Sequence, residues 1–213
     1  MNVKVCGITN KDDAMMVLEK GADAIGVVVD VPVETPRKIT VEKAHEIRLA
    51  VEDLSHTFVT VLMPKTLDDV GRVVSKLHPD GIQLHGVETP DFVMHVREEF
   101  GLPIIKAIHV GDTVDMEYVK SVSNYSDMLL LDTKKGSRVG GTGEAHDVEK
   151  DLEIKSSTGK RILLSGGINP INVFERASKV KPYGVDVSSG VEKSPGIKDP
   201  DKVEKIIEVC SCL

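Results

Sequence analysis

The chain has 213 residues, of which 40% are hydrophobic and 29% charged, and its formal net charge at neutral pH is −7. The 27 basic residues are interleaved with 34 acidic ones, so no basic block indicates a nucleic-acid partner and no acidic tail indicates disorder. No apolar run approaches the ~18 residues that a membrane span needs, and three cysteines fit a reducing compartment better than a disulfide framework.

Apolar runs rich in β-branched residues alternate with stretches of helical period along the chain. The runs predict buried strands at residues 3–6, 24–29, 57–63, 81–84, 104–108, 128–131, 161–165 and 184–187. The stretches that follow them predict helices at residues 11–20, 40–52, 66–77, 90–100, 113–122 and 148–155, then one that begins at 169–170 and a last one over 199–209.

Eight strand–helix units in 213 residues average about 27 residues each, close to the ~30 expected of a β–α–β unit. We therefore predict the α/β class, as a single (β/α)8 barrel domain over residues 1–213. An open, doubly wound sheet is the competing fold. That fold needs a dinucleotide-binding fingerprint at its first turn, and Cys6-Gly7-Ile8-Thr9 does not provide one.

The regular alternation is interrupted after the sixth predicted strand. Residues 133–147 are polar and rich in glycine, and they show no periodicity. A loop of this length in a compact domain is usually functional or disordered. We therefore expect this segment to lie near the site rather than in the core.

Two glycine–serine turns follow the seventh and eighth predicted strands, Ser165-Gly166-Gly167 and Ser188-Ser189-Gly190. In many barrels these two loops bind a phosphate, because glycine lets backbone N–H groups approach the anion and a helix N-terminus favours negative charge. Such turns can also serve only to reverse the chain. Their occurrence after this particular pair of strands favours a phosphate site.

Cys6 ends the first predicted strand and Asp132 comes directly after the sixth, at the positions where a barrel places its chemistry. A cysteine at a strand end is most often a small buried hydrophobe, whereas Asp132 has no helix immediately after it to cap. Together the two could transfer protons on a small substrate. A free thiol is only a few per cent ionised at pH 7 and a free carboxyl only ~0.1% protonated. We therefore expect burial and repulsion to move both pKa values toward neutrality.

Arg37 and His85 are further candidates for contact with a substrate. Arg37 lies in the proline-rich loop after the second strand, and its guanidinium could hold a carboxylate in a bidentate pair. A lone arginine is more often solvated surface. His85 ends the strand at residues 81–84, where a histidine is as often structural as functional.

Eight short motifs are spread over almost the whole chain: Lys4-Val5-Cys6-Gly7-Ile8-Thr9, Gly21-Ala22-Asp23-Ala24-Ile25-Gly26, Thr35-Pro36-Arg37, Gln83-Leu84-His85-Gly86, Leu130-Leu131-Asp132-Thr133, Gly140-Gly141-Thr142-Gly143, Leu164-Ser165-Gly166-Gly167-Ile168 and Val185-Asp186-Val187-Ser188-Ser189-Gly190-Val191-Glu192. In this order they resemble the phosphoribosylanthranilate isomerase family of tryptophan biosynthesis. Each motif is weak alone, and together they are highly specific.

The resemblance implies an Amadori rearrangement of N-(5-phosphoribosyl)anthranilate, with no metal and no organic cofactor. The residue matching Asp132 would be the general acid that opens the ribose ring, and the residue matching Cys6 the base that removes a proton from the second sugar carbon. Arg37 would hold the anthranilate carboxylate.

The remaining substrate-binding residues also follow from the resemblance. They are His85, Gly143 in the long loop, Gly166 and Gly167, and Ser188, Ser189 and Gly190. The phosphorylated small molecule would be the partner of a cytoplasmic enzyme that binds neither nucleic acid nor membrane and is a monomer or homodimer.

The chain departs from the family pattern in two places. The family often has an aromatic residue after the glycine of the second strand, where this chain has Val27-Val28-Val29. After the Gly-Gly-Thr-Gly motif it usually has a Lys-x-Phe-Asp-Trp run, of which this chain keeps only Asp147. These differences affect the packing of the long loop rather than the predicted acid and base.

Three other functions fit parts of the pattern. A phosphosugar epimerase would need metal ligands at several strand ends, and His85 is the only good candidate. An indole-forming synthase would need a catalytic lysine, for which Lys106 is near a strand end, but the chain lacks the N-terminal extension of those enzymes. A sensor that binds a phosphorylated ligand would need neither Cys6 nor Asp132.

Overall fold

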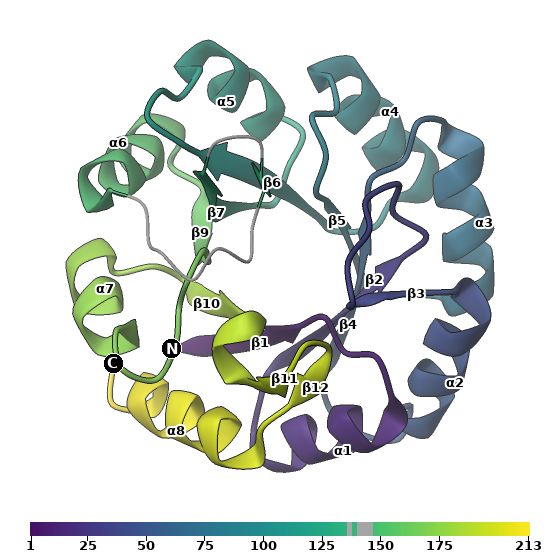
Figure 1. Cartoon of the computed structure of the whole chain (residues 1–213). Helices are drawn as coiled ribbons and strands as arrows, with labels where there is room; N and C mark the ends of the chain where they lie inside the picture. The colour runs from purple at the N-terminus through teal and green to yellow at the C-terminus, as the bar shows by residue number, and fades with distance from the viewer. Residues whose placement is uncertain (136–137, 140–146) are drawn as a thin grey trace.

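The computed structural model describes residues 1–135, 138–139 and 147–213. Its helices form a ring around a central sheet of strands that closes on itself (Figure 1). None of the helices in this described part combines the length and apolar character that a membrane crossing requires.

In the described residues, the barrel wall consists of eight parallel strands: β1 (Asn2–Cys6), β2 (Ala24–Val29), β4 (Thr57–Leu62), β5 (Gly81–Leu84), β6 (Ile104–Val110), β7 (Met128–Lys135), β9 (Arg161–Leu164) and β10 (Gly184–Val187). The barrel closes because β1 pairs with both β2 and β10, with Lys4 in register with Ala24 on one side and with Asp186 on the other. The predicted (β/α)8 barrel is confirmed.

The outer ring consists of α1 (Lys11–Glu19), α2 (Val41–Ala50), α3 (Leu67–Leu77), α4 (Pro90–Phe100), α5 (Met116–Ser123), α6 (Val148–Thr158), α7 (Val173–Val180) and α8 (Pro200–Ser211). Most begin at a side chain that accepts a backbone N–H of the first turn. Asn10 does so for α1, and Thr66 and Asp69 form a reciprocal capping box at α3.

Several predicted boundaries differ from the observed ones, and two of these differences bear on the site. β7 continues past Leu131 to Lys135, so Asp132 lies within the strand rather than after it. α7 begins at Val173 rather than at residues 169–170, because the Asn169 side chain accepts the N–H groups of Ile171 and Asn172 and holds this segment in a turn.

Shorter elements lie at the carboxyl ends of the barrel strands. β3 (Lys38–Ile39) pairs in parallel with the end of β2, and β8 (Arg138–Val139) pairs antiparallel with the end of β7. After β10 the chain makes a single 3-10 turn, η1 (Ser189–Val191), and then the hairpin of β11 (Glu192–Ser194) and β12 (Ile197–Lys198).

The core has two layers because alternate strand residues face opposite sides of the wall. The larger layer lies between strands and helices and includes Val5, Phe58 and Leu131. The smaller layer fills the barrel axis and consists of Val59, Ile105, Ala107, Leu130 and Leu163. Two residues further along several of these strands, the inward-facing side chains line an open pocket instead of the packed axis.

Candidate active site

A pocket of about 700 Å³ opens at the carboxyl ends of the barrel strands. Its lining includes Cys6, Arg37, His85 and Asp132, so the structure brings four of the predicted site residues together. The two glycine–serine turns contribute Ser165, Gly166 and Gly167, and Ser188 and Ser189, to the same pocket. The strand ends therefore meet around one space, as the barrel topology requires.

Cys6 lies at the end of β1 above a buried ion pair. The Lys4 ammonium contacts the Asp186 carboxylate at 2.7 Å, and the two side chains are only 3% and 5% exposed. Burial alone would lower the pKa of Lys4, but the charges of Asp186 and Cys6 raise it above its ordinary value. Lys4 is therefore charged at neutral pH, next to the thiol.

The pKa of the Cys6 thiol is raised rather than moved toward neutrality. Burial is the largest cause, and the charge of Asp186 adds to it, whereas the charges of Lys4 and Lys198 lower the pKa. The expectation of a lowered thiol pKa is thus wrong, because two buried cations do not offset the loss of hydration around the thiolate.

Asp132 faces the pocket from β7 beside two histidines. Its Oδ2 lies 3.4 Å from Nε2 of His85, and its own Oδ1 accepts the N–H of Thr133. His109, in register with Asp132 on the neighbouring β6, donates from Nε2 to the carbonyl of His85 at 2.9 Å. Burial, with the charges of His85 and Lys106, lowers the pKa of His109 to about 4, so this imidazole is neutral at pH 7.

Arg37 is held by a carboxylate that the sequence analysis missed. Its Nε and Nη2 donate to the two oxygens of Glu192 at 2.8 and 2.6 Å. Glu192 also pairs with the buried Lys198 at 3.1 Å, and Lys198 donates to the carbonyl of Cys6 at 2.7 Å. Burial would raise the pKa of Glu192, but the hydrogen bonds from Arg37 and the charge of Lys198 hold it below its ordinary value. The guanidinium is therefore fixed in place.

The turn after β9 has an unusual backbone that only glycine adopts readily. Gly166 and Gly167 both have positive φ angles, +72° and +73°. The side-chain amides of Asn169 and Asn172 donate to the carbonyl of Gly167 at 3.2 and 2.9 Å, which fixes this peptide. A Cβ at Gly166 would overlap the Thr133 side chain, so the turn also packs tightly against β7.

The turn after β10 packs directly on the first turn. A Cβ at Gly190 would overlap the carbonyl oxygen of Ile168, so glycine there permits the two backbones to meet. Gly190 is not part of the pocket lining, whereas Ser188 and Ser189 are. The Oγ of Ser188 is buried and has no hydrogen-bond partner among the described residues. Gly143, the remaining predicted residue, lies outside the residues that the structure describes.

Lys106 is a structural residue rather than a catalytic lysine. Its side chain is fully buried, pairs with Glu88 at 2.8 Å and donates to the carbonyls of Leu84, Gly86 and Ala107. Burial lowers the pKa of Lys106, yet its ammonium group is surrounded by acceptors and does not line the pocket. This arrangement removes the main support for an indole-forming synthase.

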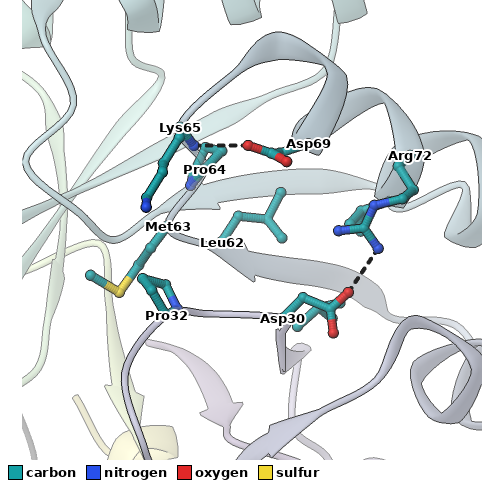
Figure 2. A pocket seen from close by; sticks show the side chains of 10 residues that line it. Asp30, Pro32, Leu62, Met63, Pro64, Lys65, Asp69 and Arg72 are labelled. Carbon is teal, nitrogen blue, oxygen red and sulfur yellow. Dashed lines mark hydrogen bonds and ion pairs between the residues drawn. The ribbon is translucent and has the colours of Figure 1, made fainter.

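A second, smaller pocket of about 160 Å³ lies between the loops after β2 and β4 and the start of α3. In Figure 2, Arg72 turns toward Asp30, and Asp69 turns toward the backbone of Lys65. The corresponding distances are 2.8 and 3.0 Å. The volume is too small for a phosphorylated sugar, and we assign no ligand to it.

The pair of Lys4 and Asp186 gives a stability prediction. Lys4→Met should lower the free energy of unfolding by about 3–5 kcal/mol near neutral pH, because it leaves a buried carboxylate without a countercharge. Adding Asp186→Leu should recover most of this loss. Denaturant unfolding of the single and double variants measures both effects.

The pH dependence provides a check on this stability prediction. Burial raises the pKa of Asp186 even with Lys4 present. For an acid with a raised folded-state pKa, the destabilisation is complete above that pKa and disappears below the unfolded-state value of ~4. The defect of Lys4→Met should therefore shrink as the pH falls toward 4. A defect that is equal at pH 4 and pH 8 would show that lost packing, not the unpaired charge, causes it.

Comparisons with known proteins agree along nearly the entire chain. The family profile described as N-(5'phosphoribosyl)anthranilate (PRA) isomerase matches residues 3–209. The N-(5'-phosphoribosyl)anthranilate isomerase of Methanocaldococcus jannaschii is 38% identical over 220 aligned positions, which cover 98% of this chain and 96% of that protein.

Solved structures give the same result. The phosphoribosyl anthranilate isomerase of Thermotoga maritima has a TM-score of 0.85 and 33% identity, with 100% of both chains covered. A phosphoribosyl anthranilate isomerase in complex with reduced 1-(o-carboxyphenylamino)-1-deoxyribulose 5-phosphate has a TM-score of 0.80 and 32% identity, again with 100% of both chains covered. The likeness therefore extends over the whole barrel rather than over one motif.

Proposed function

This chain belongs to the N-(5'-phosphoribosyl)anthranilate isomerase family, and we propose that Cys6 and Asp132 carry out the proton transfers of its reaction. The activity is the Amadori rearrangement of N-(5'-phosphoribosyl)anthranilate to 1-(2-carboxyphenylamino)-1-deoxyribulose 5-phosphate, a step of tryptophan biosynthesis. The observation that carries the assignment is that a thiol and a carboxyl from different strands line one pocket with two glycine-rich turns.

The first step is ring opening, which needs an acid. Asp132 in its protonated form gives its proton to the furanose ring oxygen while the bond from the anomeric carbon to that oxygen breaks. The anthranilate nitrogen supplies the electron pair, and the product is a protonated Schiff base. His85, whose Nε2 lies 3.4 Å from the Asp132 carboxylate, supports the role of Asp132 by orienting this side chain.

The second step is removal of the proton from the second sugar carbon, which needs a base. The Cys6 thiolate accepts this proton, the electron pair moves toward the iminium nitrogen, and an enolamine forms that tautomerises to the ketone. Lys4 and Lys198 are the cations that stabilise the thiolate. Because burial raises the thiol pKa, the thiolate is a minor form at neutral pH, and the same shift makes it a stronger base.

The pocket has groups that suit the two anionic groups of the substrate, its phosphate and its carboxylate. The Gly166–Gly167 and Ser188–Ser189 turns together suit the phosphate, because two successive glycines and an unpaired buried hydroxyl can donate to its oxygens. Arg37 suits the anthranilate carboxylate. With Nε and Nη2 committed to Glu192, its Nη1 has no acceptor among the described residues.

The direct test is to mix the purified chain with freshly made N-(5'-phosphoribosyl)anthranilate and follow the loss of anthranilate fluorescence. The chain has no tryptophan, so the protein contributes little background. We expect the fluorescence to fall in proportion to enzyme concentration. A rate no faster than that of the buffer would contradict the assignment.

Arg37 supplies the prediction for substrate binding. Arg37→Ala should raise KM by roughly 10- to 150-fold, which corresponds to the ~1.5–3 kcal/mol of a charge-assisted hydrogen bond. Inhibition by inorganic phosphate should change much less than KM, because backbone N–H groups of the glycine turns, rather than the guanidinium, would hold the phosphate. Lys38→Ala removes the neighbouring cation, which pairs with Glu34 at the surface, and serves as the matched control. If Arg37→Ala instead weakened only phosphate inhibition, the two ends of the site would be reversed.

A further inference from the structure

Three potential metal ligands meet at the mouth of the barrel. His85 follows β5, and His109 and Asp132 occupy matched positions on the adjacent strands β6 and β7. Each residue offers one ligand atom, and the three atoms lie within 4.8 Å of one another. Of these ligands only His85 was predicted from the sequence, although His109 also comes directly after a predicted strand, at residues 104–108, and this position was the available signal.

The hydrogen bond of His109 leaves its Nδ1 available as a metal ligand. Its Nε2 donates to the carbonyl of His85, which places the proton on Nε2 and a lone pair on Nδ1. This Nδ1 is buried and has no hydrogen-bond partner among the described residues. Histidines that bind metals generally donate their other ring N–H to a carbonyl or carboxylate, and His109 already has this arrangement.

His85 can adopt the matching state. Its Nδ1 lies 3.0 Å from the side-chain amide of Gln83, whose Oε1 is buried without a partner among the described residues. Rotating this amide by half a turn would let Oε1 accept the proton of Nδ1. The lone pair of His85 would then lie on Nε2, the atom that faces Asp132 at 3.4 Å.

From these contacts we propose that His85, His109 and Asp132 form a binding site for a borderline divalent metal such as Zn²⁺. Two imidazoles and one carboxylate are a ligand set that zinc prefers, and the pocket leaves a fourth position open. Tetrahedral bonds of ~2.1 Å place ligand atoms about 3.4 Å apart, so one pair is already at this spacing and small side-chain rotations would complete the site.

Occupancy of this site inhibits the isomerase. This consequence rests on the proposed function, in which Asp132 donates the proton that opens the ribose ring. A carboxylate oxygen bound to zinc carries no proton to donate, and the ion also occupies space beside the substrate. The protein therefore binds zinc at the expense of its isomerase activity.

The experiment titrates EDTA-treated, desalted protein with ZnCl₂ in competition with a chromogenic chelator, which measures binding without turnover. One zinc should bind per chain. His109→Ala and Asp132→Asn should each weaken binding by at least about 10-fold. His109→Gln, which keeps an N–H for the His85 carbonyl, should lose zinc in the same way if the alanine variant folds poorly. His95→Ala removes an exposed histidine on α4 and should bind zinc like the parent.

Zinc should also inhibit isomerisation by the parent and by His95→Ala, and EDTA should restore the rate. Binding that persists in His109→Ala and His109→Gln but disappears in Cys6→Ala or Cys212→Ser would overturn the site, because a thiol would then be the ligand. Zinc that saturates the site without inhibition would overturn the proposed consequence. Absence of isomerase activity in the metal-free protein would overturn the proposed function. The titration measures zinc binding without turnover, so it would still test the metal site.

Discussion

Cys6→Ala should lower kcat by at least about 10²-fold, the loss expected when a general base is removed, and leave the affinity for a reduced product analogue nearly unchanged. The thiol acts on a proton and contributes little to holding the substrate, so turnover and binding should separate. Cys6 is 7% exposed and sits between Lys4 and Lys198, whereas Cys212 is exposed near the end of α8. Cys212→Ala is therefore the matched control and should behave like the parent.

Two measurements decide this prediction. Steady-state kinetics give kcat, and titration with the reduced product analogue gives the affinity. A Cys6→Ala variant that kept activity within threefold of the parent would remove the thiol from the mechanism. A variant that lost affinity and kcat together would indicate that Cys6 shapes the pocket rather than moving a proton.

Asp132→Asn should lower kcat by at least about 10²-fold and change the shape of the pH profile. Asparagine nearly preserves the shape of the side chain but has no transferable acidic proton. In the parent, the active form needs a protonated carboxyl and a thiolate at once, so kcat/KM should be bell-shaped. In the variant, only the thiolate remains to titrate, and the residual rate should rise with pH and stay high.

The sign of this change follows from the pKa of Cys6. Burial raises the thiol pKa, so the thiolate fraction grows only on the alkaline side of neutrality. The residual activity of Asp132→Asn should therefore keep increasing on the alkaline side of neutrality, whereas the activity of the parent should not. Asp112→Asn alters an exposed aspartate and should keep the bell-shaped profile. The profiles are recorded in EDTA, and an alkaline limb that survives in Asp132→Asn would identify another group as the acid.

The barrel was predictable from the sequence because parallel strands that are buried on both faces consist of nearly continuous runs of apolar residues. Residues 24–29 and 128–131 show this pattern, and each strand begins where it was expected. The end of β7 was not predictable in this way, because Asp132 and the residues after it are polar rather than apolar. A barrel strand becomes polar at its carboxyl end while its backbone remains paired, as Asp132 does with His109.

The charged residues around Cys6 could not be found from the sequence. Lys4 lies between two valines, a pattern that is also typical of a strand with one face in solvent. Closure of the barrel instead buries Lys4 against Asp186. In the sequence, Glu192 and Lys198 resemble ordinary surface charges. In the structure, the β11–β12 hairpin brings them together, and Glu192 also pairs with Arg37. The pairs Lys4–Asp186 and Arg37–Glu192 join residues that are distant in the chain, and only the folded structure shows which charges are buried.

Closure of the sheet between β1 and β10 also has a consequence for the order of assembly. The contacts that complete the surroundings of Cys6 come from Asp186 and Lys198, about 180 and 190 positions along the chain. Loop closure over such separations is slow relative to local helix and hairpin formation. During synthesis and refolding the thiol is therefore the first site residue made and the last to be enclosed, so its protection from a water-soluble alkylating reagent reports the moment at which the barrel closes.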